Sequence, residues 1–142
     1  MKVNQLAQKL AITPDTVRFY TRVGLLVPSR DPTNGYKLYN AKDLKRLRFI
    51  LSARQLGFTV DDIFQILSVT DKGNSACPLV RRLIDQRLHE TEQRFKDTVL
   101  LRDRMLSAIG TWEEKPDAEP TGEMICHLIE DFSGQPNEES PQ

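Results

Sequence analysis

Residues 13–58, TPDTVRFYTRVGLLVPSRDPTNGYKLYNAKDLKRLRFILSARQLGF, carry the clearest signals of secondary structure in the chain. The first of these residues predict a helix start. Thr13 can cap the free backbone amides, Pro14 suits the first helical position, and Asp15 lies near the positive end of the helix dipole. The helical period continues until Gly24, which stops it. A short helix beginning at Pro14 is therefore expected.

Another short helix precedes this one. The segment VNQLAQKLA, residues 3–11, places its apolar residues on one helix face. Two short helices with a tight connection fit either a generic helical hairpin or a helix-turn-helix unit whose second helix enters the major groove of DNA. In the latter case the DNA-facing helix carries Thr16, Arg18, Phe19 and Tyr20.

A hairpin is predicted next, in SRDPTNGYKLYN, residues 29–40, because Asn34-Gly35 is a strong turn signal. It is either an isolated surface hairpin or a small basic wing beside the helix-turn-helix. The cations and aromatic hydroxyls around its turn suit phosphate contacts that fix the register of a protein on DNA. These residues are Arg30, Tyr36, Lys37 and Tyr39.

The charge distribution also favours a nucleic acid as the partner. The net charge of the chain is zero, yet residues 1–58 carry eleven Lys or Arg against three Asp, while residues 110–142 carry one Lys against nine acidic residues. A basic N-terminal block suits a polyanion, and an acidic C-terminal block does not.

Composition bounds the remaining possibilities. The chain has 142 residues, of which 39% are hydrophobic and 28% charged, so we expect one compact unit with extensions. The N-terminus lacks the apolar core of a signal peptide and no uncharged apolar run approaches a membrane span, which predicts a soluble, cytoplasmic protein without a membrane partner. The motifs of zinc metalloproteases, phosphate-binding loops and serine hydrolases are absent, so an enzyme is not expected.

Residues 13–58 resemble the winged helix-turn-helix of the MerR family of transcriptional regulators. The resemblance lies in the Arg-x-Tyr of the second helix, the Gly-Leu-Leu that leaves it, the wing and the following helix pair. It implies a mainly α-helical fold with an N-terminal winged helix-turn-helix DNA-binding domain, a long dimerisation helix in an antiparallel coiled coil, and a short C-terminal effector segment. It also implies a homodimer that binds double-stranded promoter DNA and distorts it on sensing a signal, so that RNA polymerase can use the promoter. The residues assigned to DNA contact are Thr13, Thr16, Arg18, Tyr20, Arg30, Tyr36, Lys37 and Tyr39.

A long helix is predicted from Pro78 to Ile109. Side chains at spacings of three and four residues, close to a heptad repeat, form a seam along it. The seam is covered either by a second copy of the helix or by the chain's own N-terminal domain, and the length of the stripe favours a second copy. The seam residues are Val80, Ile84, Leu88, Thr91, Phe95, Thr98, Arg102, Met105 and Ile109.

The two cysteines are too few for a disulfide framework and are candidate ligands, reactive thiols or small buried residues. With Pro78 at the first helical position, Cys77 is expected at the helix cap, where free amides and the helix dipole favour a thiolate. The plainer interpretation is a cysteine in place of a serine cap. In the metal-sensing branch of the MerR family, a cysteine before this helix resembles the ligand that distinguishes sensors of divalent ions from sensors of monovalent copper.

A second group of candidate ligands lies in EMICHLIE, residues 123–130, which predicts a short amphipathic helix. Cys126 and His127 offer a soft and a borderline ligand and resemble the family's metal-binding tail, although His127 is equally suited to face solvent. The resemblance implies a zinc, cadmium or lead ion held by Cys77, Cys126 and His127.

This chain departs from the family pattern where such sensors usually carry further cysteines, because Trp112 and Glu113 occupy that place. Two alternatives follow. Loop acids or water complete the shell, or the ion is bound in linear or trigonal geometry through Cys77 of one chain and Cys126 of the other. The candidate loop acids, which are otherwise solvated, are Glu113, Glu114, Asp117 and Glu119.

The predicted organisation is a DNA-binding domain over residues 1–70, a connector over 71–77, a dimerisation helix over 78–110, an effector loop with a short helix over 111–131, and a disordered polar tail over 132–142. The favoured function is transcriptional regulation in response to a divalent metal ion. The alternative keeps the DNA-binding domain and makes the cysteines a switch for oxidants or electrophiles.

Overall fold

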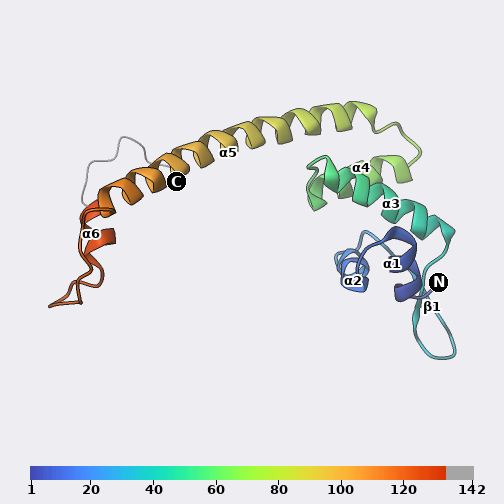
Figure 1. The fold of residues 1–142 in the computed structure, drawn as a ribbon. Coiled ribbons are helices and arrows are strands. Elements are labelled where there is room, and N and C mark those ends of the chain that lie inside the picture. The colour runs from blue at the N-terminus through green and yellow to red at the C-terminus, as the bar shows by residue number, and fades with distance from the viewer. Residues whose placement is uncertain (134–142) are drawn as a thin grey trace. The chain divides into compact units, whose positions relative to one another are not determined.

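The computed structural model describes residues 1–133 and is mainly helical (Figure 1). The chain divides into two compact units, Met1–Arg87 and a second that begins at Leu88. Within the described residues, no helix is long and apolar enough to cross a membrane. The elements are α1 (Val3–Leu10), α2 (Pro14–Arg22), β1 (Ser29–Arg30), β2 (Lys37–Leu38), α3 (Ala41–Gln55), α4 (Val60–Asp71), α5 (Cys77–Trp112) and α6 (His127–Ser133).

Side-chain caps begin three of the helices in the first unit. The Thr13 hydroxyl accepts from the Thr16 amide at 3.2 Å at the start of α2, with Pro14 at the first helical position, as predicted. Reciprocal capping boxes begin α3, between Asn40 and Asp43, and α4, between Thr59 and Asp62. These local signals explain why the helix starts could be predicted closely from the sequence.

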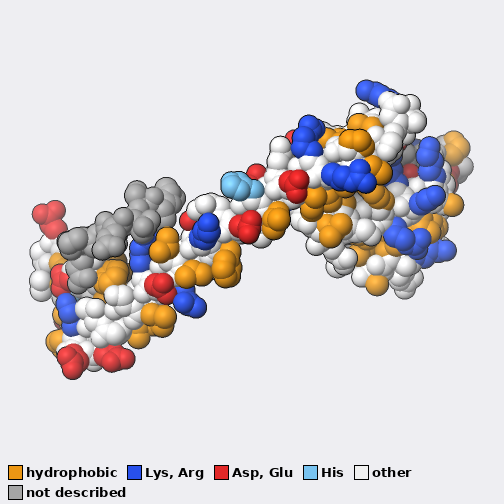
Figure 2. All heavy atoms as spheres, turned by 90° about the horizontal axis from the view of Figure 1, so that it is seen from above, with side chains coloured by type: hydrophobic (Ala, Val, Ile, Leu, Met, Phe, Trp, Pro, Cys, Tyr) orange, Lys and Arg blue, Asp and Glu red, His pale blue; other side chains and the backbone are white. Residues whose placement is uncertain are grey.

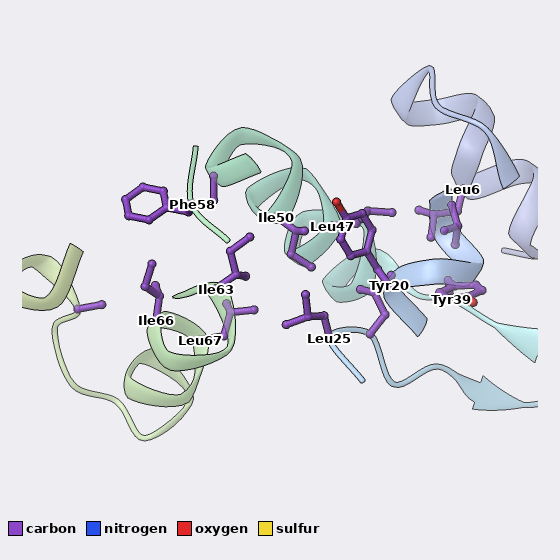
Figure 3. Close-up of a cluster of buried hydrophobic side chains, with 14 of the residues drawn as sticks. Leu6, Tyr20, Leu25, Tyr39, Leu47, Ile50, Phe58, Ile63, Ile66 and Leu67 are labelled. Atoms are coloured by element: carbon purple, nitrogen blue, oxygen red, sulfur yellow. The ribbon is translucent and has the colours of Figure 1, made fainter. Parts of the chain in front are cut away.

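The hydrophobic core of the first unit is built where α3 and α4 meet the exit of α2. Figure 3 shows Leu47 and Ile50 of α3 together with Ile63 of α4, and Leu25 beside them. Leu25, Leu47 and Ile50 are all fully buried. This core fixes α2 and the wing on one scaffold.

The wing is wider than predicted. Ser29 pairs with Leu38 and Arg30 pairs with Lys37 in an antiparallel register, so six residues join the two strands. The predicted hairpin is confirmed, with Asn34-Gly35 inside its loop rather than forming a two-residue turn. Gly35 has a φ of +74°, and its amide donates to the Asp31 carbonyl at 2.8 Å, which closes a broader loop.

Helix α5 begins one residue earlier and ends three residues later than the range Pro78–Ile109. In the second unit most large apolar side chains of this helix are exposed, and Figure 2 shows hydrophobic side chains among charged ones along it. The predicted seam is therefore available to a partner helix. The exposed apolar residues are Leu88, Phe95, Leu101, Met105, Leu106 and Ile109.

Helix α6 is shifted relative to the prediction. Cys126 lies just before it rather than within it, because the Glu130 carboxylate accepts from the amides of Ile125 and Cys126 at 2.7 and 2.6 Å and so caps the helix start. The helix includes Phe132 and Ser133, which the sequence assigned to the disordered tail. The rest of that predicted tail, 134–142, lies outside the described residues.

Trp112 holds α6 against the end of α5. Its indole N–H donates to the Leu128 carbonyl at 2.9 Å, and its ring meets Phe132 edge to face with centroids 6.4 Å apart. Both rings are half-buried, and edge-to-face packing of this kind stabilises the contact between α5 and α6. Trp112 therefore connects the end of α5 to α6 within the same chain.

Candidate functional site

Helices α1 and α2 and the wing enclose one basic surface hollow. It has a volume of about 300 Å³ and is lined by cations from three elements, Lys2, Arg18 and Arg30 among them. Cations grouped around a hollow of this size suit the phosphate groups of a nucleic-acid backbone. The full lining is Lys2, Val3, Asn4, Arg18, Arg30, Gly35, Tyr36 and Lys37.

The α2 residues assigned to DNA contact fall into two environments. Arg18 is 55% exposed and its guanidinium donates to the Asp15 carboxylate at 2.8 Å. The hydroxyls of Thr13 and Thr16 lie 2.9 Å apart at the exposed helix start. Tyr20, in contrast, is only 6% exposed and belongs to the core.

The wing residues divide in the same way. Tyr36 is 56% exposed, with the Lys2 ammonium 4.9 Å from its ring centroid, and the Arg30 guanidinium donates to the Gly35 carbonyl at 3.1 Å. Tyr39 is buried, and its hydroxyl lies 2.8 Å from the Thr21 hydroxyl. The prediction that the Tyr39 hydroxyl is displayed at the wing is wrong, because this ring packs at the wing's base.

Cys77 is the first residue of α5, not its cap. Ala76 takes the place before the helix, since its carbonyl accepts from the Val80 amide at 2.8 Å. The Cys77 side chain is exposed and lies at a hollow of about 430 Å³. That hollow is lined by Phe49, Ile66, Thr70, Ala76, Cys77, Val80 and Arg81.

The second unit holds Cys126 and His127. Cys126 is half-buried and carries a free thiol. The Nε2 of His127 lies 2.9 Å from the Pro116 carbonyl, which can only accept, so Nε2 carries a proton. His127 Nδ1 lies 3.9 Å from the Asp131 carboxylate. In a neutral imidazole, Nδ1 is then the nitrogen with a free lone pair.

The loop acids proposed to complete a metal shell, Glu113, Glu114, Asp117 and Glu119, are all exposed. Within residues 1–133 of a single chain, no three His, Cys, Asp or Glu side chains form a group that could hold an ion. Cys77 belongs to the first unit, and Cys126 and His127 belong to the second.

Comparison with known proteins identifies the family. Residues 1–69 match the MerR HTH family regulatory protein family, and residues 44–108 match the MerR, DNA binding family. The HTH-type transcriptional regulator ZntR of Escherichia coli (strain K12) is 34% identical over 97 residues, which is 68% of this chain and 69% of that protein. The chain belongs to the MerR family. A further relative, the HTH-type transcriptional regulator HmrR of Rhizobium leguminosarum bv. viciae, is 30% identical over 94% of this chain and 98% of its own length.

Solved MerR-family structures share the fold. The transcription regulator PbrR691 from Ralstonia metallidurans CH34 in complex with lead(II) has a TM-score of 0.69 at 25% identity, covering 93% of this chain and 98% of that one. The EcmrR–DNA complex has a TM-score of 0.63 at 27% identity, covering 81% of this chain and 40% of that one. The predicted family and mainly α-helical fold are confirmed, and the chain is a transcriptional regulator rather than an enzyme.

Two contacts of the first unit were not predicted from the sequence. Asp15 pairs with Arg18 on the exposed side of α2, and the i, i+3 spacing of opposite charges was a usable signal. Lys2 lines the basic hollow and contacts the Tyr36 ring, and no local pattern in the sequence pointed to that contact.

Proposed function

We propose that this MerR-family regulator binds double-stranded promoter DNA as a homodimer and distorts it when a divalent ion of the zinc, cadmium or lead class is bound, so that RNA polymerase can use the promoter. The basic hollow between α2 and the wing supports the DNA-binding part. Relatives support it too, since EcmrR was solved as a complex with DNA. A cytoplasmic location is part of the same proposal.

The observation that carries the metal-sensing part is the exposed Cys77 thiol at the start of α5, together with a second free thiol at Cys126. Thiolate and imidazole are ligands that zinc and softer divalent ions favour. PbrR691, which shares the fold over most of its length, was solved with lead(II).

The surroundings of His127 fit a ligand. A metal-binding histidine commonly donates its other ring N–H to a carbonyl or carboxylate, which orients the ring. The Pro116 carbonyl accepts from Nε2 in this way and leaves Nδ1 for an ion. In this proposal Cys77 of one protomer and Cys126 with His127 of its partner hold the ion, with an acid or water completing the shell.

The DNA-binding part is tested by selecting duplexes from a random library with the purified protein. We expect enrichment of a pseudo-palindrome, as a two-fold symmetric dimer requires, and weaker binding of the selected duplex after Arg18→Ala or Arg30→Ala. Lys9→Ala, on α1 but outside the lining of the basic hollow, is the control. A library that yields no enriched sequence would contradict this part.

The metal part is tested by native mass spectrometry of the reduced protein titrated with Zn(II), Cd(II), Pb(II) and Cu(I). We expect about one divalent ion per protomer and the loss of tight binding in Cys77→Ser and in Cys126→Ser. His127→Ala should weaken binding, whereas His89→Ala, a change at an exposed histidine of α5, should leave it unchanged. Ions lost to a mild chelator from the unaltered protein would count against metal sensing.

A thiol switch is the second candidate, and the exposure of the free Cys77 thiol favours it. An oxidant or electrophile would then modify Cys77, with or without a disulfide to Cys126. A transcriptional response to an electrophile that survives Cys126→Ser but not Cys77→Ser would support this candidate over chelation.

A further inference from the structure

Arg46 of α3 joins three segments of the first unit that are far apart in the sequence. Its Nε–H donates to the Leu25 carbonyl at 2.8 Å, and its two terminal nitrogens donate to the two carboxylate oxygens of Asp71 at 3.1 and 3.3 Å. Because a guanidinium is planar, these donors keep fixed directions relative to one another. A displacement of Asp71 must therefore move Arg46 or break one of its bonds.

Leu25 connects Arg46 to the helix assigned to DNA. The Leu25 amide donates to the Tyr20 carbonyl at 3.0 Å, and Gly24 before it has a φ of +90°, which ends α2. The Leu25 side chain is fully buried in the core (Figure 3). The Leu25 carbonyl is thus tied to the last turn of α2, so a change at this carbonyl changes how α2 leaves the core.

Asp71 connects Arg46 to the start of α5. It is the last residue of α4, and only residues 72–76 separate it from Cys77. This connector stays bonded to the end of α4, where the Gly73 amide donates to the Thr70 carbonyl at 2.9 Å. A displacement at Cys77 therefore reaches Asp71 through a short segment with little slack.

The Arg46–Asp71 pair contributes little to the stability of the fold, but it fixes the position of the Arg46 side chain relative to α4. The side chain of Arg46 is 25% exposed and that of Asp71 is 55% exposed, and exposed ion pairs contribute little to stability. The hydrogen bond from Arg46 lowers the pKa of the Asp71 carboxyl from its usual value of 3.8, so the pair is ionised at neutral pH. The Phe64 ring of α4 also lies close to the exit of α2, because a Cβ added to Gly24 would lie 3.6 Å from it.

We propose that Arg46 is a positioning residue that couples the connector before Cys77 to the exit of α2. This inference rests on the proposed function, in which Cys77 receives the signal and α2 binds DNA. When a ligand or adduct at Cys77 displaces the connector, Asp71 moves, Arg46 follows, and the Leu25 carbonyl moves with it. The coupling is reciprocal, so DNA on α2 alters the free energy of binding at Cys77 by the same amount.

The test compares DNA affinity before and after a small change at Cys77. In a Cys126→Ser background, Cys77 is carbamidomethylated with iodoacetamide, and the Kd for a duplex selected by the unaltered protein is measured with and without the adduct. We expect the adduct to change this Kd by about fivefold or more. In Arg46→Lys and in Asp71→Asn the adduct should leave the Kd nearly unchanged, because the guanidinium fork is lost.

The ratio of the two Kd values within each variant is the readout, so a uniform loss of affinity or stability cancels. Arg48→Lys, the same change at an exposed residue of the same helix, should keep the full ratio. A full ratio in Arg46→Lys would overturn the inference, and so would an adduct without effect in the parent protein. If the library yields no duplex, the proposed function itself fails, and the inference fails with it.

Discussion

The first unit buries a hydrophobic core within one chain, whereas many large apolar side chains of the second unit lie at the surface. Leu25, Leu47 and Ile63 of the first unit are fully buried, while Phe95 and Met105 of the second are 70% and 55% exposed. A helix with a long apolar stripe is stabilised when a partner covers it. The difference indicates that the DNA-binding unit folds around its own core and that the second unit depends on a second copy.

The two ends of the chain also differ in charge. The basic residues concentrate before Phe58 and the acidic residues after Ile109, so polyanion binding and the candidate effector segment occupy opposite ends of the sequence. Because Cys77 lies in the first unit, a signal that acts on Cys77 enters that unit directly. Four experiments test this difference between the two units.

The largest effect is expected in the first unit. Leu47→Ala removes a fully buried side chain and should lower the free energy of unfolding by about 2–5 kcal/mol, because a cavity remains. Urea unfolding measures this loss, which should not depend on protein concentration. Leu56→Ala, at a residue 67% exposed, is the control and should be close to neutral. Similar losses in the two variants would contradict a core held within one chain.

The next effect is expected in the second unit. Phe95→Glu places a charge on the apolar stripe and should weaken dimerisation by about 2 kcal/mol or more, roughly a thirtyfold rise in the dimer Kd. Analytical ultracentrifugation over a concentration series measures it. His89→Glu, at an exposed polar position of the same helix, should have little effect. An unchanged dimer Kd in Phe95→Glu would show that the stripe is not the interface.

A smaller effect is expected from a helix cap in the first unit. The Thr59 hydroxyl accepts from the Asp62 amide at 3.0 Å, so Thr59→Ala should cost about 1 kcal/mol of stability. Thermal unfolding at fixed concentration measures it, with Ser68→Ala on the exposed face of α4 as the control. Equal Tm values for the two variants would show that the Thr59 cap does not stabilise the protein.

The smallest effect concerns Asp71. Its pKa is lowered from 3.8 mainly by the hydrogen bond from Arg46, so the pair's contribution to stability is present above about pH 3.8 and is lost as the pH falls through the lower folded value. An NMR titration of the Asp71 carboxyl should give a pKa below 3.8, which rises toward 3.8 in Arg46→Lys. An Asp71 pKa that is identical in the unaltered protein and in Arg46→Lys would show that Arg46 does not lower it.

The sequence predicted the features that depend on neighbouring residues better than the features that depend on tertiary contacts. The caps at Thr13 and Thr59 carry their own partners within three residues, so the sequence located those helix starts. The burial of Tyr39 depends on contacts with the distant residues Thr21 and Met1, and no local pattern encodes them.

The candidate site was predictable only in part for the same reason. Cys77 could be placed at the start of α5 because Pro78 marks that start. The sequence did not show that Glu130 caps α6 and leaves Cys126 outside it, nor that Arg46 links Leu25 to Asp71 over more than twenty residues on either side. Such contacts follow from packing, which periodicity does not describe.

A heterodimer of two variants shows whether the proposed metal site is shared between two chains. Protomers carrying Cys77→Ser and protomers carrying Cys126→Ser are mixed, and the heterodimer, resolved by different affinity tags, is titrated with Cd(II) in native mass spectrometry. A shared site leaves one Cys77 and one Cys126 paired across the interface, so the account predicts one ion per heterodimer and none in either variant homodimer. A heterodimer that binds no ion, while the unaltered dimer binds two, would contradict it.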